Sequence, residues 1–346
     1  MRYIREDLQE LVPYRASNYE YKIALNSNES PFDLPEGTKK RLIKHMHSDN
    51  LFNRYPDPDS TLLRKAIAKH CKVDASNILV ASGSDELIQM IINTFVNKGE
   101  CVLYPTPSFS MYKIYTQICG GIPVSVELGG DYKYNIDTFI EMGHRYDAKV
   151  AFICNPNNPT GTTIDREEIK SFIEEFKGIV VIDEAYIEFH GGTVMDFILK
   201  YDNVIVLRTF SKAFGAAGLR IGYLVANQGL VDDVYVTKSP YNINTFSQLT
   251  ALELLKDWDK VKERIDYIIA ERERLYGILC AIDNIDVFPS SANFLLIKVE
   301  DSQYVYDELL KRGILVRNFS EDDALANHIR VSVGSKEEND IFVQEF

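Results

Sequence analysis

The sequence predicts an α/β protein with a large domain on a mostly parallel mixed sheet flanked by helices, plus a smaller α+β domain. Three observations lead to this prediction. Short apolar runs rich in β-branched residues recur as far as residue 226, each bounded by turn residues. Helix-like segments lie between many of them, and this alternation is typical of a parallel sheet covered on both faces. After residue 244 the pattern changes to long amphipathic helix and then to a few short strands.

The strands of the large sheet are predicted from runs that are too short for a typical helix. In chain order these runs are residues 78–81, 101–104, 122–127, 149–154, 179–183, 204–208 and 221–226. Segments 84–96, 108–119 and 165–176 have the apolar spacing of helices, with Ser84 and Asp165 as candidate N-caps.

The second unit begins with residues 247–282, which read as one long amphipathic helix. Short strands and one helix follow, at 286–289, 293–299, 302–312 (the helix), 314–317 and 328–333. We therefore expect a large domain over residues 30–245 and a small domain made of residues 1–29 and 246–346. The N-terminal segment is expected to pack against the second unit.

Composition limits the function classes. The 346 residues carry a net charge of −13, which argues against a general binder of nucleic acid or acidic membrane. The charged start is unlike a signal peptide, and no apolar run approaches the ~20 residues that span a bilayer. The 5 scattered cysteines form no C-x-x-C pair, so we expect reduced thiols, a cytoplasmic location and no metal site.

The residues that suggest chemistry follow four predicted strands. Lys212 lies in "TFSKAFGAAGLR", Asp183 ends "IVVID", "NPNNPTG" follows "AFIC", and "SGSDE" follows "ILVA". In doubly wound sheets, ligands bind beyond the carboxyl ends of the strands. The sequence therefore predicts that a lysine, an aspartate, an asparagine cluster and a helix N-terminus meet at one edge of the sheet.

Pyridoxal phosphate is the group that suits this combination. Its aldehyde requires a lysine for a Schiff base, and its ring nitrogen requires a carboxylate to stay protonated. Its phosphate requires backbone N–H groups at a helix start, hydroxyl groups and an arginine. The residues that supply these groups are Lys212, Asp183, Ser84, Asp85, Thr209, Ser211 and Arg220. No G-x-G-x-x-G follows a predicted strand, which disfavours a nicotinamide enzyme.

The sequence resembles the fold-type I pyridoxal-phosphate enzymes and, more narrowly, the histidinol-phosphate aminotransferases. The resemblance runs almost end to end. It is carried by "LVPYRAS", "LNSNESPF", "RYPDPDS", "ASGSDELI", "PSFSMY", "NPNNPTG", "DEAYIEF", "TFSKAFGAAGLRIGY" and "RVSVGSKEEND". Two positions depart from the family pattern: "ASGSDE" lacks an asparagine before the glycine, and Phe109 stands where tyrosine is common.

The resemblance implies a role for each matched residue at the cofactor. Lys212 is the Schiff-base lysine and proton carrier, and Asp183 pairs with the ring nitrogen. Asn158 and Tyr186 hold the ring hydroxyl, and Phe109 stacks on the ring face. The phosphate contacts are Ser84, Asp85, Thr209, Ser211, Arg220 and, across a homodimer interface, Tyr55 of the other chain.

At the substrate end, the resemblance implies that Arg330 binds the substrate carboxylate and that Tyr14, Asn28 and Arg317 line the site. The implied reaction is transamination between glutamate and a small phosphorylated ketone. Three alternatives stay open: transamination of another phosphorylated ketone such as dihydroxyacetone phosphate, decarboxylation of a phospho-amino acid, and a binding module that keeps only the fold. The intact Lys212 and Asp183 count against the last.

Overall fold

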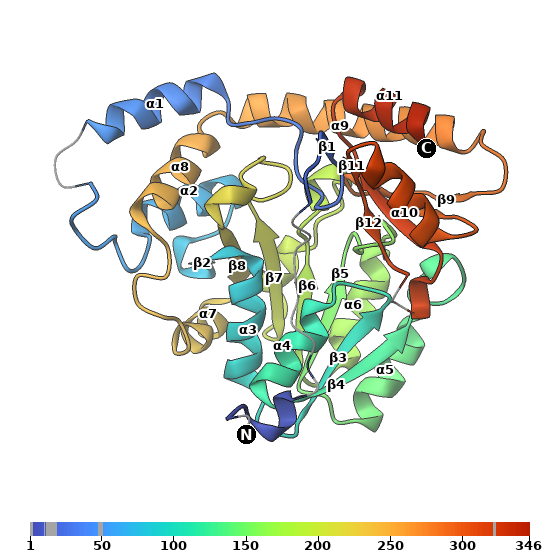
Figure 1. The fold of residues 1–346 in the computed structure, drawn as a ribbon. Helices are drawn as coiled ribbons and strands as arrows, with labels where there is room; N and C mark the ends of the chain where they lie inside the picture. The colour runs from blue at the N-terminus through green and yellow to red at the C-terminus, as the bar shows by residue number, and fades with distance from the viewer. Residues whose placement is uncertain (1–2, 10, 12–18, 48–50, 321–322) are drawn as a thin grey trace.

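The computed structural model describes residues 3–9, 11, 19–47, 51–320 and 323–346, and its centre is a seven-stranded sheet (Figure 1). The strands are β2 (Ile78–Ala81), β3 (Cys101–Thr106), β4 (Ile122–Glu127), β5 (Val150–Cys154), β6 (Ile179–Asp183), β7 (Val204–Thr209) and β8 (Gly222–Ala226). Their order is β2-β8-β7-β6-β5-β3-β4. All neighbours are parallel except β8, which is antiparallel to β2 and β7. The seven predicted strands and the mostly parallel sheet are confirmed.

Helices cover both faces of this sheet. They are α2 (Thr61–Cys71), α3 (Gly83–Phe95), α4 (Met111–Cys119), α5 (Ile136–Arg145), α6 (Arg166–Glu175), α7 (Gln228–Tyr235), α8 (Thr245–Leu255) and α9 (Trp258–Leu279), whereas α1 (Glu36–Met46) packs on α8. One core joins α3, α4 and α7 to the sheet, and the other joins α2, α5, α6, α8 and the first half of α9 to its opposite face. Short 3₁₀ turns lie at Glu6–Leu8, Ala75–Asn77, Gly130–Tyr132, Ile187–Phe189, Met195–Leu199, Ala217–Leu219 and Asp323–Leu325.

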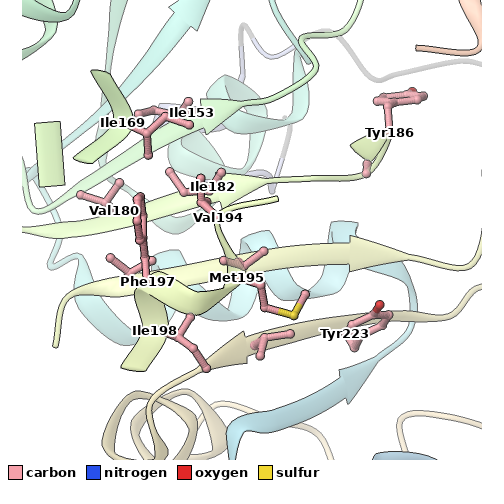
Figure 2. Packing of buried hydrophobic residues seen from close by; sticks show 14 of the residues in the cluster. Ile153, Ile169, Val180, Ile182, Tyr186, Val194, Met195, Phe197, Ile198 and Tyr223 are labelled. Carbon is pink, nitrogen blue, oxygen red and sulfur yellow. The ribbon is translucent and has the colours of Figure 1, made fainter. Parts of the chain in front are cut away.

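The two cores explain why the strands are apolar along their whole length. In β5, Phe152 and Cys154 face the core with α3 and α4, whereas Ala151 and Ile153 face the core with α6. Figure 2 shows the latter core, with Ile153 and the neighbouring strand residues packed together and Tyr186 beyond the end of its strand. The site residues must therefore lie where the strands end.

The two predicted helix caps have different outcomes. Asp165 caps α6 through a capping box with Glu168, as predicted. The prediction of Ser84 as a cap is wrong, because α3 begins at Gly83 and Ser82 is its N-cap. Gly83 has a φ of +80°, which lets the chain turn from β2 directly into the helix.

The second unit is a four-stranded antiparallel sheet of order β12-β13-β10-β9. Its elements are β9 (Asp286–Phe288), β10 (Phe294–Lys298), α10 (Ser302–Lys311), β11 (Ile314–Leu315), β12 (Arg317–Asn318), β13 (His328–Ser332) and α11 (Lys336–Glu345). The strand β1 (Ile23–Ala24) pairs in parallel with β11 (Figure 1). That pairing confirms the expected packing of the N-terminal segment for residues 23–24, whereas Arg5 donates a hydrogen bond to the carbonyl oxygen of Ile118 in α4 of the large domain.

The prediction of one long helix over 247–282 is wrong, because the chain forms α8 and α9 with a break at Asp257. The Asp257 carboxylate accepts a hydrogen bond from Thr38 Oγ1 at 2.7 Å and pairs with Arg41 at 2.9 Å. Within α9, Ile268 joins the core of the large sheet whereas Leu275 joins the core of the small one. Among the described residues, no helix is long and apolar enough to cross a membrane.

Candidate active site

The carboxyl ends of β2, β5, β6 and β7 deliver the predicted residues to one edge of the large sheet, as expected for a doubly wound fold. Asp183 is the last residue of β6, and Lys212 follows β7 by three positions. The segment containing Asn158 follows β5, and α3 follows β2. The parallel direction of these strands places the four segments at the same edge.

The Lys212 side chain lies at this edge of the sheet, where its amine is fixed by a hydrogen bond. Its Nζ donates a hydrogen bond to the carbonyl oxygen of Ser27 at 2.8 Å and lies 5.9 Å from the centre of the Tyr186 ring. Burial, with the nearby positive charge of Arg330, lowers the pKa of Lys212 to about 8. An amine with this pKa exists partly in its neutral, nucleophilic form near neutral pH.

Asp183 is buried, with 3% of its surface exposed. Its Oδ2 accepts a hydrogen bond from the Tyr112 hydroxyl at 2.7 Å, and its Oδ1 accepts one from the Ala185 N–H at 3.0 Å. Burial raises the pKa of Asp183 to about 6. Both partners are neutral, and none of the salt bridges between described residues involves this carboxylate.

The N-terminus of α3 forms a cradle whose shape depends on two glycines. A Cβ on Gly222 would lie 2.4 Å from the backbone nitrogen of Ser84, so only glycine allows β8 to approach the helix start. Gly83 supplies the positive φ of the turn. Arg220 pairs here with Asp85 at 2.7 Å. The cradle therefore combines free helix N–H groups with a guanidinium, which is the chemistry of a phosphate site.

Thr209 is the last residue of β7, and Ser211 directly precedes Lys212. Both are buried, and the Thr209 Oγ1 accepts a hydrogen bond from the Ser211 N–H at 3.0 Å. The same hydroxyl donates to the carbonyl oxygen of Ile221 at 3.3 Å. These contacts fix the segment on which Lys212 stands.

Tyr186 is buried in a network that joins the two sheets. Its hydroxyl accepts a hydrogen bond from Asn28 Nδ2 at 2.9 Å. Asn28 has a φ of +53° and is fixed by two further hydrogen bonds. Its N–H donates to Ser332 Oγ at 2.8 Å, and its carbonyl oxygen accepts from Asn293 Nδ2 at 3.0 Å. Burial raises the pKa of Tyr186, so its hydroxyl stays protonated.

Arg330 extends from the small sheet to the edge of the large one. It donates a hydrogen bond from Nη1 to Asn158 Oδ1 and another from Nη2 to the carbonyl oxygen of Asn26 at 2.6 Å. Arg317 on β12 lies directly opposite Arg330 on β13 in the antiparallel register. Because opposed residues of such a pair share a face, the two arginines are on the same side of the small sheet.

Three predicted residues lie outside this network. Phe109 packs its ring edge-on against Tyr112, with the ring centres 5.6 Å apart. Tyr55 is 81% exposed and stacks on Tyr241 at 4.5 Å, and none of its contacts within the described chain reaches the strand ends. Tyr14 lies outside the described residues.

The sequence analysis missed three residues of the site: Tyr112, which contacts Asp183, and Asn293 and Ser332, which contact Asn28. Tyr112 is part of the motif "PSFSMY" and lies three positions after Phe109, which is the spacing of one helix face. That signal could have suggested Tyr112. Ser332 lies in the motif "RVSVGSKEEND", whereas no local pattern marks Asn293. Their contacts with Asn28 span 304 and 265 residues.

Comparison with known proteins assigns this arrangement to a class. Residues 20–346 match the family model "Aminotransferase class I and II". The chain belongs to this family, and it is a pyridoxal-phosphate-dependent aminotransferase of fold type I.

Within this family, curated relatives and solved structures that are similar to the chain include histidinol-phosphate aminotransferases. The chain is 46% identical over 340 residues to the histidinol-phosphate aminotransferase of Thermoanaerobacter sp. (strain X514), covering 98% of this chain and 96% of that protein. It is 47% identical to the enzyme of that name from Caldanaerobacter subterraneus subsp. tengcongensis, with the same coverage. The histidinol-phosphate aminotransferase of Sinorhizobium meliloti, solved in complex with pyridoxal-5'-phosphate, superposes with a TM-score of 0.87 at 26% identity, over 94% of this chain and 90% of that one.

Two features of this chain fit the cofactor. Asp183 is a buried carboxylate with only neutral donors around it among the described residues, and a protonated pyridine nitrogen would supply the missing positive charge. The glycine-lined cradle at α3 offers N–H groups and Arg220 to a phosphate. The residues present therefore suit both charged ends of pyridoxal phosphate.

Proposed function

We propose that the chain transfers an amino group between glutamate and the phosphorylated ketone that corresponds to histidinol phosphate. The observation that carries the proposal is the opposition of Arg317 and Arg330 on one face of the small sheet. Two guanidinium groups on one face suit two anionic groups, a carboxylate and a phosphate. The names of the relatives that are 46% and 47% identical support the same substrate.

The cofactor roles in this proposal follow the contacts described above. When bound, pyridoxal phosphate supplies an electron sink for the negative charge left by loss of the donor's α-proton. Asp183 would hold a proton on the ring nitrogen, and Asn158 and Tyr186 would hold the ring hydroxyl. The α3 cradle would hold the phosphate, through Ser84, Asp85, Thr209, Ser211 and Arg220.

Lys212 is the acid–base group of the proposal. Its amine would remove and hold the donor's α-proton and later release it, so that the same nitrogen would act first as base and then as acid. The lowered pKa of Lys212, about 8, suits this exchange near neutral pH. Phe109 is proposed to pack on the face of the cofactor ring and to keep water from it.

The substrate roles are divided between the arginines. Arg330, which reaches Asn158, binds the carboxylate of glutamate. Arg317 binds the phosphate of the second substrate, with support from Tyr14 and Asn28. Asn28 is 1% exposed and donates to Tyr186, so it also orients the tyrosine that holds the cofactor.

The proposal includes assembly and organisation. The active species is a cytoplasmic homodimer in which Tyr55 of each chain reaches the cofactor phosphate of the other. Residues 30–245 form the large domain, and residues 1–29 and 246–346 form the small one. Separate cores around the two sheets support this division, although the change of core falls inside α9.

The test is a donor–acceptor screen combined with stopped-flow measurement of each half-reaction. Charged hydrogen bonds contribute about 1.5–3 kcal/mol each, so loss of an arginine is expected to lower catalytic efficiency about 10- to 100-fold. Arg330→Ala should slow the glutamate half-reaction. Arg317→Ala should slow the acceptor half-reaction and leave the glutamate half-reaction nearly unchanged.

The same screen separates the alternatives. A higher efficiency with dihydroxyacetone phosphate than with the imidazole-bearing ketone would replace the proposed substrate. Release of carbon dioxide without a keto-acid product would identify a decarboxylase. Equal damage to both half-reactions by Arg317→Ala would remove the phosphate-binding role of that arginine.

A further inference from the structure

Tyr112 lies between two residues that are proposed to hold the cofactor ring. It is the second residue of α4, and its side chain is completely buried. Its ring stacks on Phe152 of β5 with 4.7 Å between centres and 14° between planes. It forms a T-shaped pair with Phe109, with 5.6 Å between centres and 84° between planes. The ring is therefore fixed on one side by the sheet and supports Phe109 on the other.

The Tyr112 hydroxyl is directed at the Asp183 carboxylate. The oxygen atoms are 2.7 Å apart, and an ionised carboxylate only accepts hydrogen bonds, so the tyrosine is the donor. The Ala185 N–H occupies Oδ1, so each carboxylate oxygen already has one donor. Cys154, the register partner of Asp183 on β5, gives its thiol hydrogen to the carbonyl oxygen of Pro156 instead. Tyr112 thus supplies one of two contacts that orient the carboxylate.

We propose that Tyr112 is a positioning residue of the transamination reaction. Its hydroxyl keeps Asp183 ionised and oriented toward the ring nitrogen of the cofactor, and its ring keeps Phe109 against the ring face. One buried side chain then couples the two contacts that set the electronic state and the plane of the cofactor. The inference rests on the proposed role of Asp183.

The expected consequence follows from charge. A carboxylate that loses one of its two donors in a buried site holds a proton more readily, so it holds the ring nitrogen in its protonated form less well. A positive charge on the ring nitrogen lowers the affinity of the cofactor-bound Lys212 nitrogen for its proton. Loss of the Tyr112 hydroxyl should therefore raise the pH at which that nitrogen releases its proton.

The measurement is the pH midpoint of the visible absorbance of the bound cofactor, taken on the purified holoenzyme. Tyr112→Phe keeps both ring contacts and removes only the hydroxyl. Loss of a charged hydrogen bond is worth about one pKa unit or more on Asp183, and we expect at least about half a unit of upward shift in the midpoint. The rate constant kcat should fall while KM for glutamate changes little.

Tyr223→Phe is the matched control. Tyr223 is also a completely buried tyrosine, on β8 (Figure 2). The Cys71 thiol donates to its hydroxyl at 3.7 Å. This variant removes a buried hydroxyl without touching Asp183, so the midpoint should stay at the wild-type value. An equal shift in Tyr223→Phe would show that the effect is general loosening and would overturn the proposal.

A double-mutant cycle separates this inference from the function on which it rests. Asp183→Asn should shift the midpoint by itself, and adding Tyr112→Phe should then change nothing further. If Asp183→Asn leaves the midpoint unchanged, the proposed role of Asp183 fails. If Asp183→Asn shifts the midpoint and Tyr112→Phe does not, only the role of Tyr112 is overturned. The same holds if the shifts of the two single variants add in the double variant.

A second variant covers the case in which Tyr112→Phe does not fold. Replacing Tyr112 by 3-fluorotyrosine keeps the hydroxyl and makes it a stronger donor. The midpoint should then move downward, opposite to the shift expected for phenylalanine. An upward movement, or none, would contradict the donor role.

Discussion

At the scale of the residue, the environment of Lys212 decides its reactivity. Burial and the charge of Arg330 lower the pKa of its amine to about 8, compared with about 10.4 for a lysine in water. Arg330 is thus placed to act twice, as a proposed carboxylate-binding group and as a charge that increases the neutral fraction of the lysine. The Ser27 carbonyl oxygen fixes the amine at 2.8 Å.

This environment predicts how the cofactor-free protein takes up pyridoxal phosphate. Only the neutral amine attacks the aldehyde, so the rate should rise with pH through a midpoint near 8, and stopped-flow absorbance would measure it. Arg330→Gln removes the nearby charge and should move the midpoint upward. Borohydride reduction followed by peptide mapping should place the label on Lys212.

Two results would contradict this prediction. A label on another lysine would remove Lys212 from the site. A midpoint that does not respond to Arg330→Gln would show that burial alone sets the pKa of Lys212.

At the scale of the element, the turn from β2 into α3 depends on close backbone approach. Gly222 on β8 lies against Ser84 so closely that a Cβ would be 2.4 Å from a backbone nitrogen. Backbone atoms cannot move aside as a flexible side chain can. The contact therefore fixes the helix N-terminus that is proposed to hold the phosphate.

Gly222→Ala should destabilise the protein and weaken cofactor binding. Overpacking of this kind costs about 1–3 kcal/mol of unfolding free energy, and the displaced helix start should raise the dissociation constant of pyridoxal phosphate. Denaturant unfolding and a cofactor titration would measure the two effects. Gly218→Ala is the control, since open space surrounds that glycine and its unfolding free energy should change by less than about 0.5 kcal/mol. Equal effects at the two glycines would contradict the cradle geometry.

At the scale of the whole molecule, one contact outside the active site joins the turn after β4 to the small sheet. The Tyr132 hydroxyl lies 2.9 Å from His328 Nε2, on the strand that also carries Arg330. His328 Nδ1 lies 2.9 Å from the carbonyl oxygen of Ala326, so Nδ1 carries the proton and Nε2 accepts from the tyrosine. This arrangement requires a neutral imidazole.

The contact predicts a loss of stability on acidification. Burial lowers the pKa of His328 in the folded chain. As pH falls below about 6.5, His328 therefore binds a proton in the unfolded chain before it does so in the folded chain. The free energy of unfolding should therefore fall over this range. Lys298 on β10 and Asp286 on β9, two of the other three strands of its sheet, influence His328 with opposite charges.

Urea unfolding at several pH values would test this expectation. His328→Gln keeps an acceptor but cannot take up the proton, so its stability should depend less on pH between about 7 and 5. Tyr132→Phe should cost about 1–3 kcal/mol at neutral pH, because it leaves a buried acceptor unpaired. An unchanged pH slope in His328→Gln would assign the acid sensitivity to other groups.

The proposed homodimer predicts complementation between two inactive chains. Tyr55 is 81% exposed on a single chain, and its proposed partner is the cofactor phosphate of the other chain. Mixed Tyr55→Ala and Lys212→Ala chains should regain part of the activity, because one of the two hybrid sites has neither defect. Sedimentation should show a dimer, and a fully active monomer would contradict the shared site.

The sequence by itself determined the large sheet and the main residues of the site. The strands β2, β5, β7 and β8 are buried on both faces, so they appear as continuous apolar runs that need no tertiary information to locate. Lys212, Asp183 and Asn158 stand just after such runs, and the carboxyl-end rule was enough to bring them together. Asp165 was also predictable, because a capping box is a local pattern.

Only the tertiary structure decided the features that depend on distant contacts. The antiparallel direction of β8 cannot be predicted from its apolar residues, since parallel and antiparallel strands bury the same side chains. The break at Asp257 depends on Thr38, 219 residues away, and the contact of Tyr112 with Asp183 spans 71 residues. The physical reason is that hydrophobic periodicity records which face of an element is buried, whereas a hydrogen bond between distant segments leaves no periodic signal in either one.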